Sequence, residues 1–271
     1  MKKHRVIPVL LLKNGWLVQS RSFNQYNNIG NPVTSVKRLS QWASDELIFL
    51  DITRTGKYDT RRDDQGYENR SDFLEIIRDV SKSTFMPLTV GGRIRSSNEI
   101  EERLQSGADK VALNTSLSEN PDLIKQSVKE FGAQCIVASI DAKRGTKGKY
   151  CVLTHGGTHD TKREVAEYCK YVETLGVGEI LINSIDRDGE GSGYDIPLLK
   201  AVDDSVSIPV IACGGVGEWK HFQEAFENTN VDAVAAANIF HHTDQSIFYA
   251  KKHLIKNGIN VRPPDLLTTI K

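Results

Sequence analysis

Residues 179–195 read EILINSIDRDGEGSGYD, and this stretch determines how the rest of the chain is interpreted. The apolar run Ile180, Leu181, Ile182 is too short for a helix and leads into a segment rich in Asp, Gly and Ser. This pattern indicates a buried strand that opens into a functional loop. The loop combines carboxylates with glycines, which let the backbone approach a phosphate closely.

Short apolar runs bounded by turn residues recur along the chain. They predict eight strands, at 6–12, 47–52, 87–91, 110–114, 135–140, 179–183, 209–213 and 232–237. Amphipathic patterns predict helices between and after them, at 33–43, 71–81, 97–105, 121–131, 162–175, 196–203, 218–227 and 245–256. Such an alternation, with strands too apolar to face water, predicts an α/β protein with a closed parallel (β/α)8 TIM barrel. An open doubly wound sheet is the alternative, and the lack of a G-x-G-x-x-G after the first strand argues against it.

The two halves of the chain resemble each other. MPLTVGG at 86–92 is echoed by IPVIACGG at 208–215, and ELIFLDI at 46–52 matches the segment that begins at Glu179. We therefore expect a single barrel domain over 1–271, built from two similar half-barrels at approximately 1–131 and 132–271. Each half then has its own Gly-Gly turn, which predicts two phosphate sites facing each other across the barrel mouth.

Composition limits the classes of partner. Lys plus Arg and Asp plus Glu both number 35, so no net charge favours nucleic acid or an anionic membrane. The four cysteines form no C-x-x-C pair and no His cluster has metal-ligand spacing, which indicates reduced thiols. The run at 6–12 contains Pro8 and is too short for a signal or a membrane span. We expect a cytoplasmic protein without metal or other cofactor, whose partner is a small molecule or a protein.

Catalytic and binding residues of a (β/α)8 barrel come from the C-terminal ends of its strands. Asp141 ends the fifth strand and is a candidate general acid or base, with a turn-capping or ion-paired carboxylate as the structural alternative. The doubled pattern predicts a partner for it at the end of the first strand, where Leu11 stands. The candidate phosphate and substrate contacts at the strand ends are Asp51, Gly91, Gly92, Asn114, Thr115, Asp186, Asp188, Gly189, Gly214, Gly215, Ala237 and Asn238.

Six motifs carry a resemblance to a known family. They are DELIFLDIT at 45–53, TVGG at 89–92, GADKV at 107–111, SIDAK at 139–143, SIDRDG at 184–189 and NVR at 260–262. Together they resemble the cyclase subunit of imidazole glycerol phosphate synthase, from about residue 5 to residue 262. The resemblance implies an enzyme that closes an imidazole ring with ammonia from a bound glutaminase, using two aspartates as acid and base. Asp141 matches one aspartate, and the other falls on Leu11.

Leu11 can neither donate nor accept a proton, and losing one acid–base group costs about 10²- to 10⁴-fold in rate. Other departures from the family lie on the same face. Arg93 replaces a third glycine, Gln19 a loop lysine and Asn238 a serine. The segment 56–70 is longer than the family's loop, and it is either a solvated flap or a lid or docking surface.

The opposite end of the predicted barrel carries four charges. Arg5, Glu46, Lys110 and Glu179 start strands one, two, four and six, so they should meet as a ring. On the residues alone the ring could be a polar plug that seals a packed core. The resemblance instead implies the charged gate through which ammonia enters, and it places Asp109 in the contact with the glutaminase.

Three functions remain open. The first is a cyclase-like subunit of a glutamine amidotransferase that forms a heterodimer with a glutaminase, with ring closure weakened or lost. By family analogy alone, it would pass ammonia to a third enzyme that amidates a sugar of a surface polysaccharide such as lipopolysaccharide. The second is an active cyclase of histidine biosynthesis, a lyase in which Asp51 or Asp186 replaces the missing acid. The third is an isomerase of a phosphorylated sugar, which needs no partner. A phosphorylated small molecule or inorganic phosphate is the expected ligand.

Overall fold

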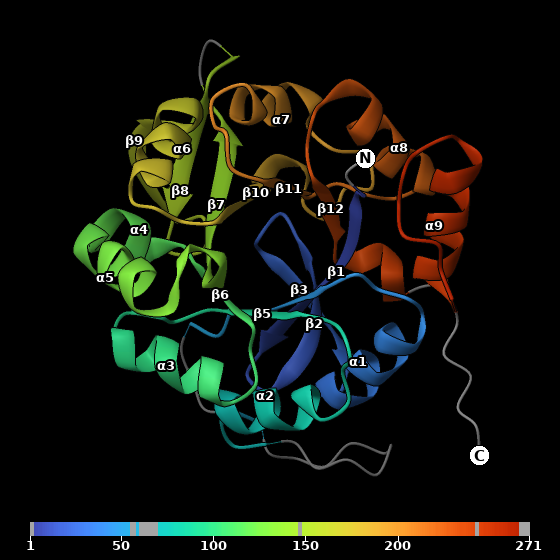
Figure 1. Ribbon diagram of the computed structural model, residues 1–271, viewed down its shortest axis with the longest axis horizontal. Helices are drawn as coiled ribbons and strands as arrows, with labels where there is room; N and C mark the ends of the chain where they lie inside the picture. Colours follow the sequence, from blue (N-terminus) through green and yellow to red (C-terminus); the bar gives the residue numbers. More distant parts are fainter. Residues whose placement is uncertain (1–2, 55–57, 60–69, 146–147, 242–243, 266–271) are drawn as a thin grey trace.

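Eight parallel strands close a barrel around the centre of the molecule (Figure 1). The computed structural model describes residues 3–54, 58–59, 70–145, 148–241 and 244–265. Parallel pairing of the first strand with the last and of the fifth with the sixth completes the cylinder, which confirms the predicted (β/α)8 TIM barrel. Its strands are β1 (Arg5–Lys13), β4 (Leu47–Asp51), β5 (Leu88–Gly91), β6 (Lys110–Leu113), β7 (Ile136–Arg144), β10 (Glu179–Ser184), β11 (Val210–Cys213) and β12 (Ala233–Ala236).

Helices surround the barrel, and several of them begin at residues whose side chains accept backbone N–H groups. Ser96 with Glu99 forms a capping box, and the side chains of Asp72 and Asn120 accept the amides of Glu75 and Leu123. Helices predicted at 97–105, 121–131 and 196–203 have those bounds, and the others differ by one to three residues at an end. The described helices, of which α4 was not predicted, are α1 (Pro32–Gln41), α2 (Phe73–Ser81), α3 (Ser97–Gln105), α4 (Thr115–Glu119), α5 (Pro121–Phe131), α6 (Val165–Thr174), α7 (Ile196–Asp203), α8 (Trp219–Asn228) and α9 (Ser246–Lys256).

Two antiparallel extensions of the sheet were not predicted. β2 (Trp16–Arg21) and β3 (Gln25–Gly30) follow β1, and β8 (Tyr150–Thr154) and β9 (His159–Glu164) follow β7. β3 and β9 are largely polar and partly exposed, so they lack the apolar alternation that marks a half-buried strand. The helix predicted from residue 162 therefore begins three residues later, after β9.

The core has two layers separated by the barrel wall. Alternate residues of β1 face opposite ways, so that Val6 and Leu10 pack under the helices whereas Ile7 and Val9 pack inside the barrel. The inner cluster is aliphatic and includes the small side chains of Ala112, Ala233 and Ala235, among others. The inner cluster between the two polar ends is therefore apolar.

Equivalent strands of the two halves begin with the same kind of hydrogen bond. Asp109 Oδ2 accepts a hydrogen bond from the amide of Leu88 at 2.8 Å, and Asp232 Oδ2 accepts one from the amide of Val210 at 2.8 Å. These residues occupy matching places in the two halves of the sequence, so the repeat extends to individual hydrogen bonds. The half-barrel boundaries stay a prediction.

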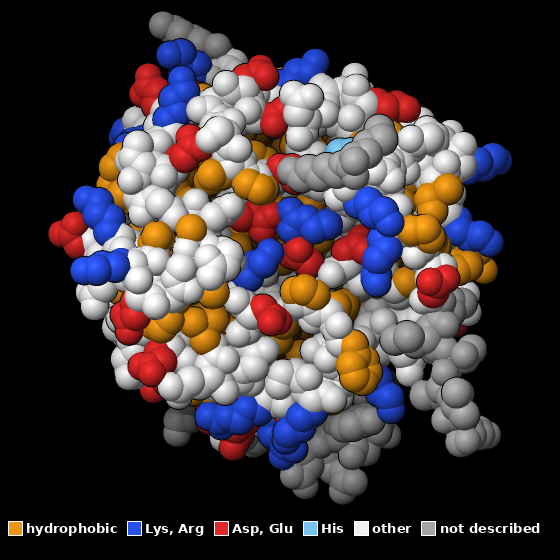
Figure 2. Space-filling view, viewed as in Figure 1, with side chains coloured by type: hydrophobic (Ala, Val, Ile, Leu, Met, Phe, Trp, Pro, Cys, Tyr) orange, Lys and Arg blue, Asp and Glu red, His pale blue; other side chains and the backbone are white. Residues whose placement is uncertain are grey.

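The surface agrees with the balanced composition. Figure 2 shows acidic and basic side chains interspersed over the face that it presents. In the described residues, no helix combines the length and apolar character needed to cross a membrane.

Candidate active site at the barrel mouth

The C-terminal ends of the strands enclose two adjoining cavities, of about 1180 and 750 Å³. Their walls share Asp188, Cys213 and Ala237. Most of the predicted site residues line one or both of them. The larger cavity contains Leu11, Asp51, Gly92, Asn114, Thr115 and Asp141, and the smaller contains Gly189, Gly214, Gly215 and Asn238.

Two predicted contacts, Gly91 and Asp186, are not among the lining residues. A Cβ on Gly91 would lie 2.7 Å from the Leu50 side chain and 2.9 Å from Ala112, so this glycine allows the strands to approach. Asp186 is exposed and accepts the Arg144 amide at 2.6 Å. The segment at 56–70 lies mostly outside the described residues, apart from residues 58–59 and 70.

Asp141 is the buried carboxyl group of the mouth. Its side chain accepts a hydrogen bond from Asn114 Nδ2 at 3.0 Å, and Asn183, its register partner on β10, also donates to it. Burial raises the pKa of Asp141 to about 7, with a smaller contribution from the charge of Asp188 and opposition from the two amide hydrogen bonds. This carboxyl group can therefore exchange a proton near neutral pH, as a general acid or base must.

Leu11 faces the same cavity. It is partly buried, lies in register beside Leu50 of β4, and packs against the inner cluster together with Ala237. The aliphatic side chain thus occupies the mouth and is not turned away from it. The wall at this place provides no proton donor or acceptor.

Among the further carboxylates that line the larger cavity are two predicted ones, Asp188 and Asp51. Asp188 is 9% exposed and accepts hydrogen bonds from Ser20 Oγ at 2.7 Å and the Phe23 amide at 3.2 Å. Burial raises the pKa of Asp188. Asp51 accepts the Thr53 amide at 2.9 Å and the Tyr58 hydroxyl at 2.7 Å. Both carboxylates are therefore held in place by hydrogen bonds from other residues of the mouth.

Several lining residues escaped the sequence analysis. Asn183 was detectable, because it continues the alternation of Glu179 and Leu181 on β10 toward the barrel interior. Others lie in connecting segments or in the two unpredicted hairpins, where no strand end pointed to them. They include Phe23, Tyr26, Arg54, Tyr58 and His155.

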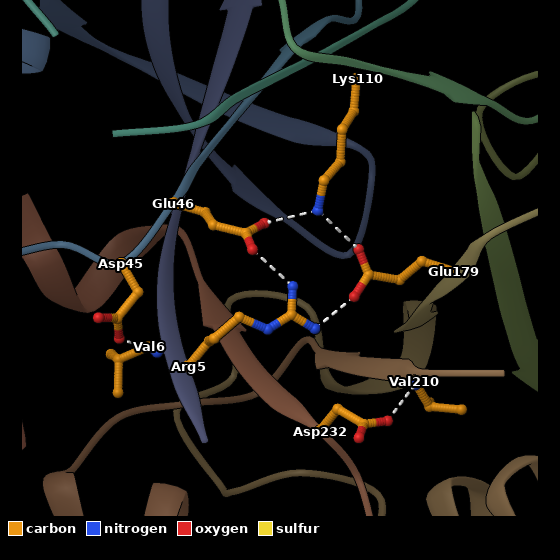
Figure 3. A network of polar contacts seen from close by, with 8 residues as sticks. All are labelled: Arg5, Val6, Asp45, Glu46, Lys110, Glu179, Val210 and Asp232. Atoms are coloured by element: carbon orange, nitrogen blue, oxygen red, sulfur yellow. Dashed lines mark hydrogen bonds and ion pairs between the residues drawn. The ribbon is translucent and has the colours of Figure 1, made fainter. Parts of the chain in front are cut away.

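The four charges at the opposite end form a closed ring (Figure 3). Arg5 binds Glu46 at 2.6 Å and also Glu179, and Lys110 Nζ lies 3.1 Å from Glu46 and 3.2 Å from Glu179. The two glutamate side chains are 9% and 8% exposed, and the basic ones 22% and 20%. Each member therefore contacts two opposite charges. Asp109, the predicted partner contact, is exposed at the adjoining start of β6.

Fold and site define a (β/α)8-barrel protein with a carboxylate-lined cavity at the C-terminal strand ends and a charged ring at the other end. Residues 5–246 match the family described as histidine biosynthesis protein. Two proteins named imidazole glycerol phosphate synthase subunit HisF, from Streptococcus sanguinis (strain SK36) and Streptococcus gordonii (strain Challis), are each 40% identical over 262 residues, which is 97% of this chain and 100% of theirs. The chain therefore belongs to the histidine biosynthesis protein family and is similar to its HisF subunits, as the motifs predicted.

Proposed function

We propose that this chain is the barrel subunit of a glutamine amidotransferase, which binds a glutaminase at the ring end and conducts ammonia to the mouth without efficient ring closure. The observation that carries the proposal is the pairing of a complete charged ring with Leu11 in the mouth. The ring end keeps the four charged residues that the resemblance assigns to the entrance for ammonia. The mouth has Leu11 where the family has a proton-transfer aspartate.

The interior of the barrel favours a neutral molecule over an ion. Between ring and mouth the barrel is lined by aliphatic side chains such as Ile7, Ile48 and Val137. An ammonium ion would lose its hydration there at a cost of several kcal/mol, whereas neutral ammonia would lose far less. The ring then stands at the start of the path, and a nitrogen donor would enter past Glu46 and Glu179, whose oxygens pair with Arg5 and Lys110.

The mouth is poorly equipped for a reaction that needs two proton-transfer groups. Asp141 retains a pKa of about 7, but Leu11 offers no second group. Oδ2 of Asp188 already accepts hydrogen bonds from Ser20 and Phe23. Ammonia leaving the mouth would then react with an acceptor held by another enzyme. By analogy with second copies of cyclase-like proteins, we propose a sugar of a surface polysaccharide as that acceptor.

An active cyclase of histidine biosynthesis is the second candidate. It is favoured by the 40% identity to HisF subunits and by Asp188, which lines the same cavity as Asp141 with a raised pKa. In this alternative Asp188 would supply the proton transfer that Leu11 cannot.

Two experiments test these candidates. Mixing the purified chain with the matching glutaminase should stimulate glutamate formation from glutamine, and a lack of association would overturn the proposal and favour a partner-free sugar-phosphate isomerase. A histidine auxotroph without its cyclase should grow poorly with the unsubstituted chain and better with Leu11→Asp, with Leu50→Asp as the control. Robust growth with the unsubstituted chain would establish the active cyclase.

A further inference from the structure

Phe85 is the most exposed large apolar side chain in the described part of the chain. It is 89% exposed, whereas Tyr249 and Ile255, the next in order there, are 48% and 43% exposed. Single apolar residues are common on protein surfaces, so exposure alone assigns no role to Phe85. Its position at the ring end of the barrel does.

The turn that carries Phe85 joins α2 to β5 and lies beside the charged ring. The carbonyl of Pro87 accepts a hydrogen bond from the amide of Leu47 at 2.9 Å, and Leu47 directly follows the ring residue Glu46. On its other side β5 pairs with β6, whose first residue is the ring residue Lys110. The turn therefore enters the barrel wall between two neighbouring members of the ring, Glu46 and Lys110, which contact each other (Figure 3).

The backbone holds this turn in place on both sides of Phe85. Before it, the amide of Ser83 donates to the carbonyl of Val80 at 2.9 Å, which closes the end of α2. After it, Met86 is partly buried and packs against the outer core cluster, whereas Phe85 faces the solvent. A side chain presented by a fixed turn loses little conformational freedom when a partner covers it.

The equivalent turn of the second half shows that the fold does not require an aromatic residue at this place. Aligning MP at 86–87 with IP at 208–209 puts Ser207 opposite Phe85. Ser207 is also exposed, but its amide and its hydroxyl both donate to Glu173 Oε1, at 2.9 and 2.6 Å. A small polar residue therefore suits a turn of this kind, and the aromatic ring of Phe85 is an addition of the first half.

Charged groups around Phe85 are already compensated within the chain. Each ring member contacts two opposite charges, as described above. Lys82 Nζ lies 3.4 Å from Asp79, and Asp109 Oδ2 accepts the amide of Leu88 at 2.8 Å. These paired charges offer a partner little net attraction. An apolar contact is then the stronger source of affinity at this end of the barrel.

From these observations we infer that Phe85 is the apolar anchor that holds the glutaminase on the ring end, by inserting its aromatic ring into an apolar pocket of that partner. A partner that covers Glu46 and Lys110 must also cover the turn between them. Aromatic residues are enriched in protein interfaces, and a few such anchors supply most of the affinity. The inference rests on the proposed function in taking a glutaminase as the partner. It goes further by assigning affinity to Phe85 and not to the ring.

Phe85→Ser tests the inference, because it gives the turn the residue of its equivalent in the second half. Tyr249→Ser is the matched control, since it removes an exposed aromatic side chain near the start of α9, at the mouth end of the barrel. Both variants should stay folded. Calorimetric titration with the matching glutaminase should show a Kd raised about tenfold or more in Phe85→Ser and unchanged in Tyr249→Ser. The maximal stimulated rate of glutamine hydrolysis should stay the same in both, because the ring is intact.

Equal Kd values for Phe85→Ser and the unsubstituted chain would overturn the inference and leave the proposed function standing. So would an equal loss of affinity in Tyr249→Ser, or a lower maximal rate of Phe85→Ser at an unchanged Kd. Sedimentation of the chain alone adds one more outcome. A dimer that Phe85→Ser dissociates would make a second copy of the chain the occupant of this surface and overturn the inference. Failure of the unsubstituted chain to bind the glutaminase would overturn both the inference and the proposed function.

Discussion

Asn183 of β10 lies in direct register with Asp141 of β7, and its amide donates a hydrogen bond to the Asp141 carboxyl group. Asn183 Oδ1 is buried without a hydrogen-bond partner in the described part of the chain. The amide therefore serves the carboxyl group in particular. Together with Asn114 it limits how far burial raises the pKa of Asp141.

Replacing Asn183 with Leu should raise the pKa of Asp141 above its value of about 7, because one donor to the carboxylate is lost while burial remains. Carbon-13 NMR titration of the Asp141 carboxyl carbon would measure the change. Asn98→Leu, on the exposed face of α3, is the control. An unchanged or lower pKa in Asn183→Leu would show that this hydrogen bond does not stabilise the charged form.

Asp141→Asn should stabilise the protein above neutral pH. The folded pKa of about 7 exceeds the ordinary value of 3.8, so the folded state binds the proton more tightly than the unfolded state does. The associated stability is fully present below about pH 4 and is lost as pH rises to about 7. Above pH 8 the variant should gain at most about 4 kcal/mol, from a shift of roughly three pKa units at 1.36 kcal/mol each.

Urea unfolding at pH 4 and pH 8 would measure this difference. The gain should shrink toward pH 4, where both the unsubstituted chain and the variant have a neutral group at this position. An equal gain at both pH values would indicate a packing effect and not the removal of a buried charge.

The barrel could be predicted because short segments of the sequence specify its strands and helices individually. The wall strands are apolar runs, and residues such as Asn120 and Pro121 at the start of α5 specify a helix start by their own chemistry. The hairpins could not be predicted in this way. β3 and β9 are defined by backbone pairing with β2 and β8, and this pairing leaves no apolar period in their sequences.

The candidate site was predictable to the same extent. Residues at strand ends, such as Asp141 and Asn114, follow from the topology. The contact between Ser20 and Asp188 does not, because it joins the unpredicted β2 to the loop after β10. The positive φ of Arg93 likewise depends on the three-dimensional path of its turn.

Lys110→Met should destabilise the fold by about 2–3 kcal/mol, because it leaves Glu46 and Glu179 to share Arg5 alone. The expected loss is below that of a fully buried pair, since Lys110 is 20% exposed. Lys200→Met, at an exposed position of α7, should change stability by less than about 0.5 kcal/mol. Chemical unfolding of both variants would decide, and equal stabilities would show that the ring does not contribute to the fold.

Gly92→Ala should abolish folding or cost more than about 4 kcal/mol in the free energy of unfolding. Gly92 has a φ of 104°, and a Cβ there would lie 2.1 Å from the carbonyl oxygen of Asp51, a backbone atom that cannot swing aside. Gly258→Ala separates the two causes, because Gly258 has a φ of 80° and a Cβ there would meet no described atom within 4 Å. It should cost only about 1 kcal/mol for the left-handed backbone. Denaturant titration would measure the free energy of unfolding of both variants. Similar losses would show that backbone strain alone explains the need for glycine at position 92, and that the close approach of the β5 turn to Asp51 does not contribute.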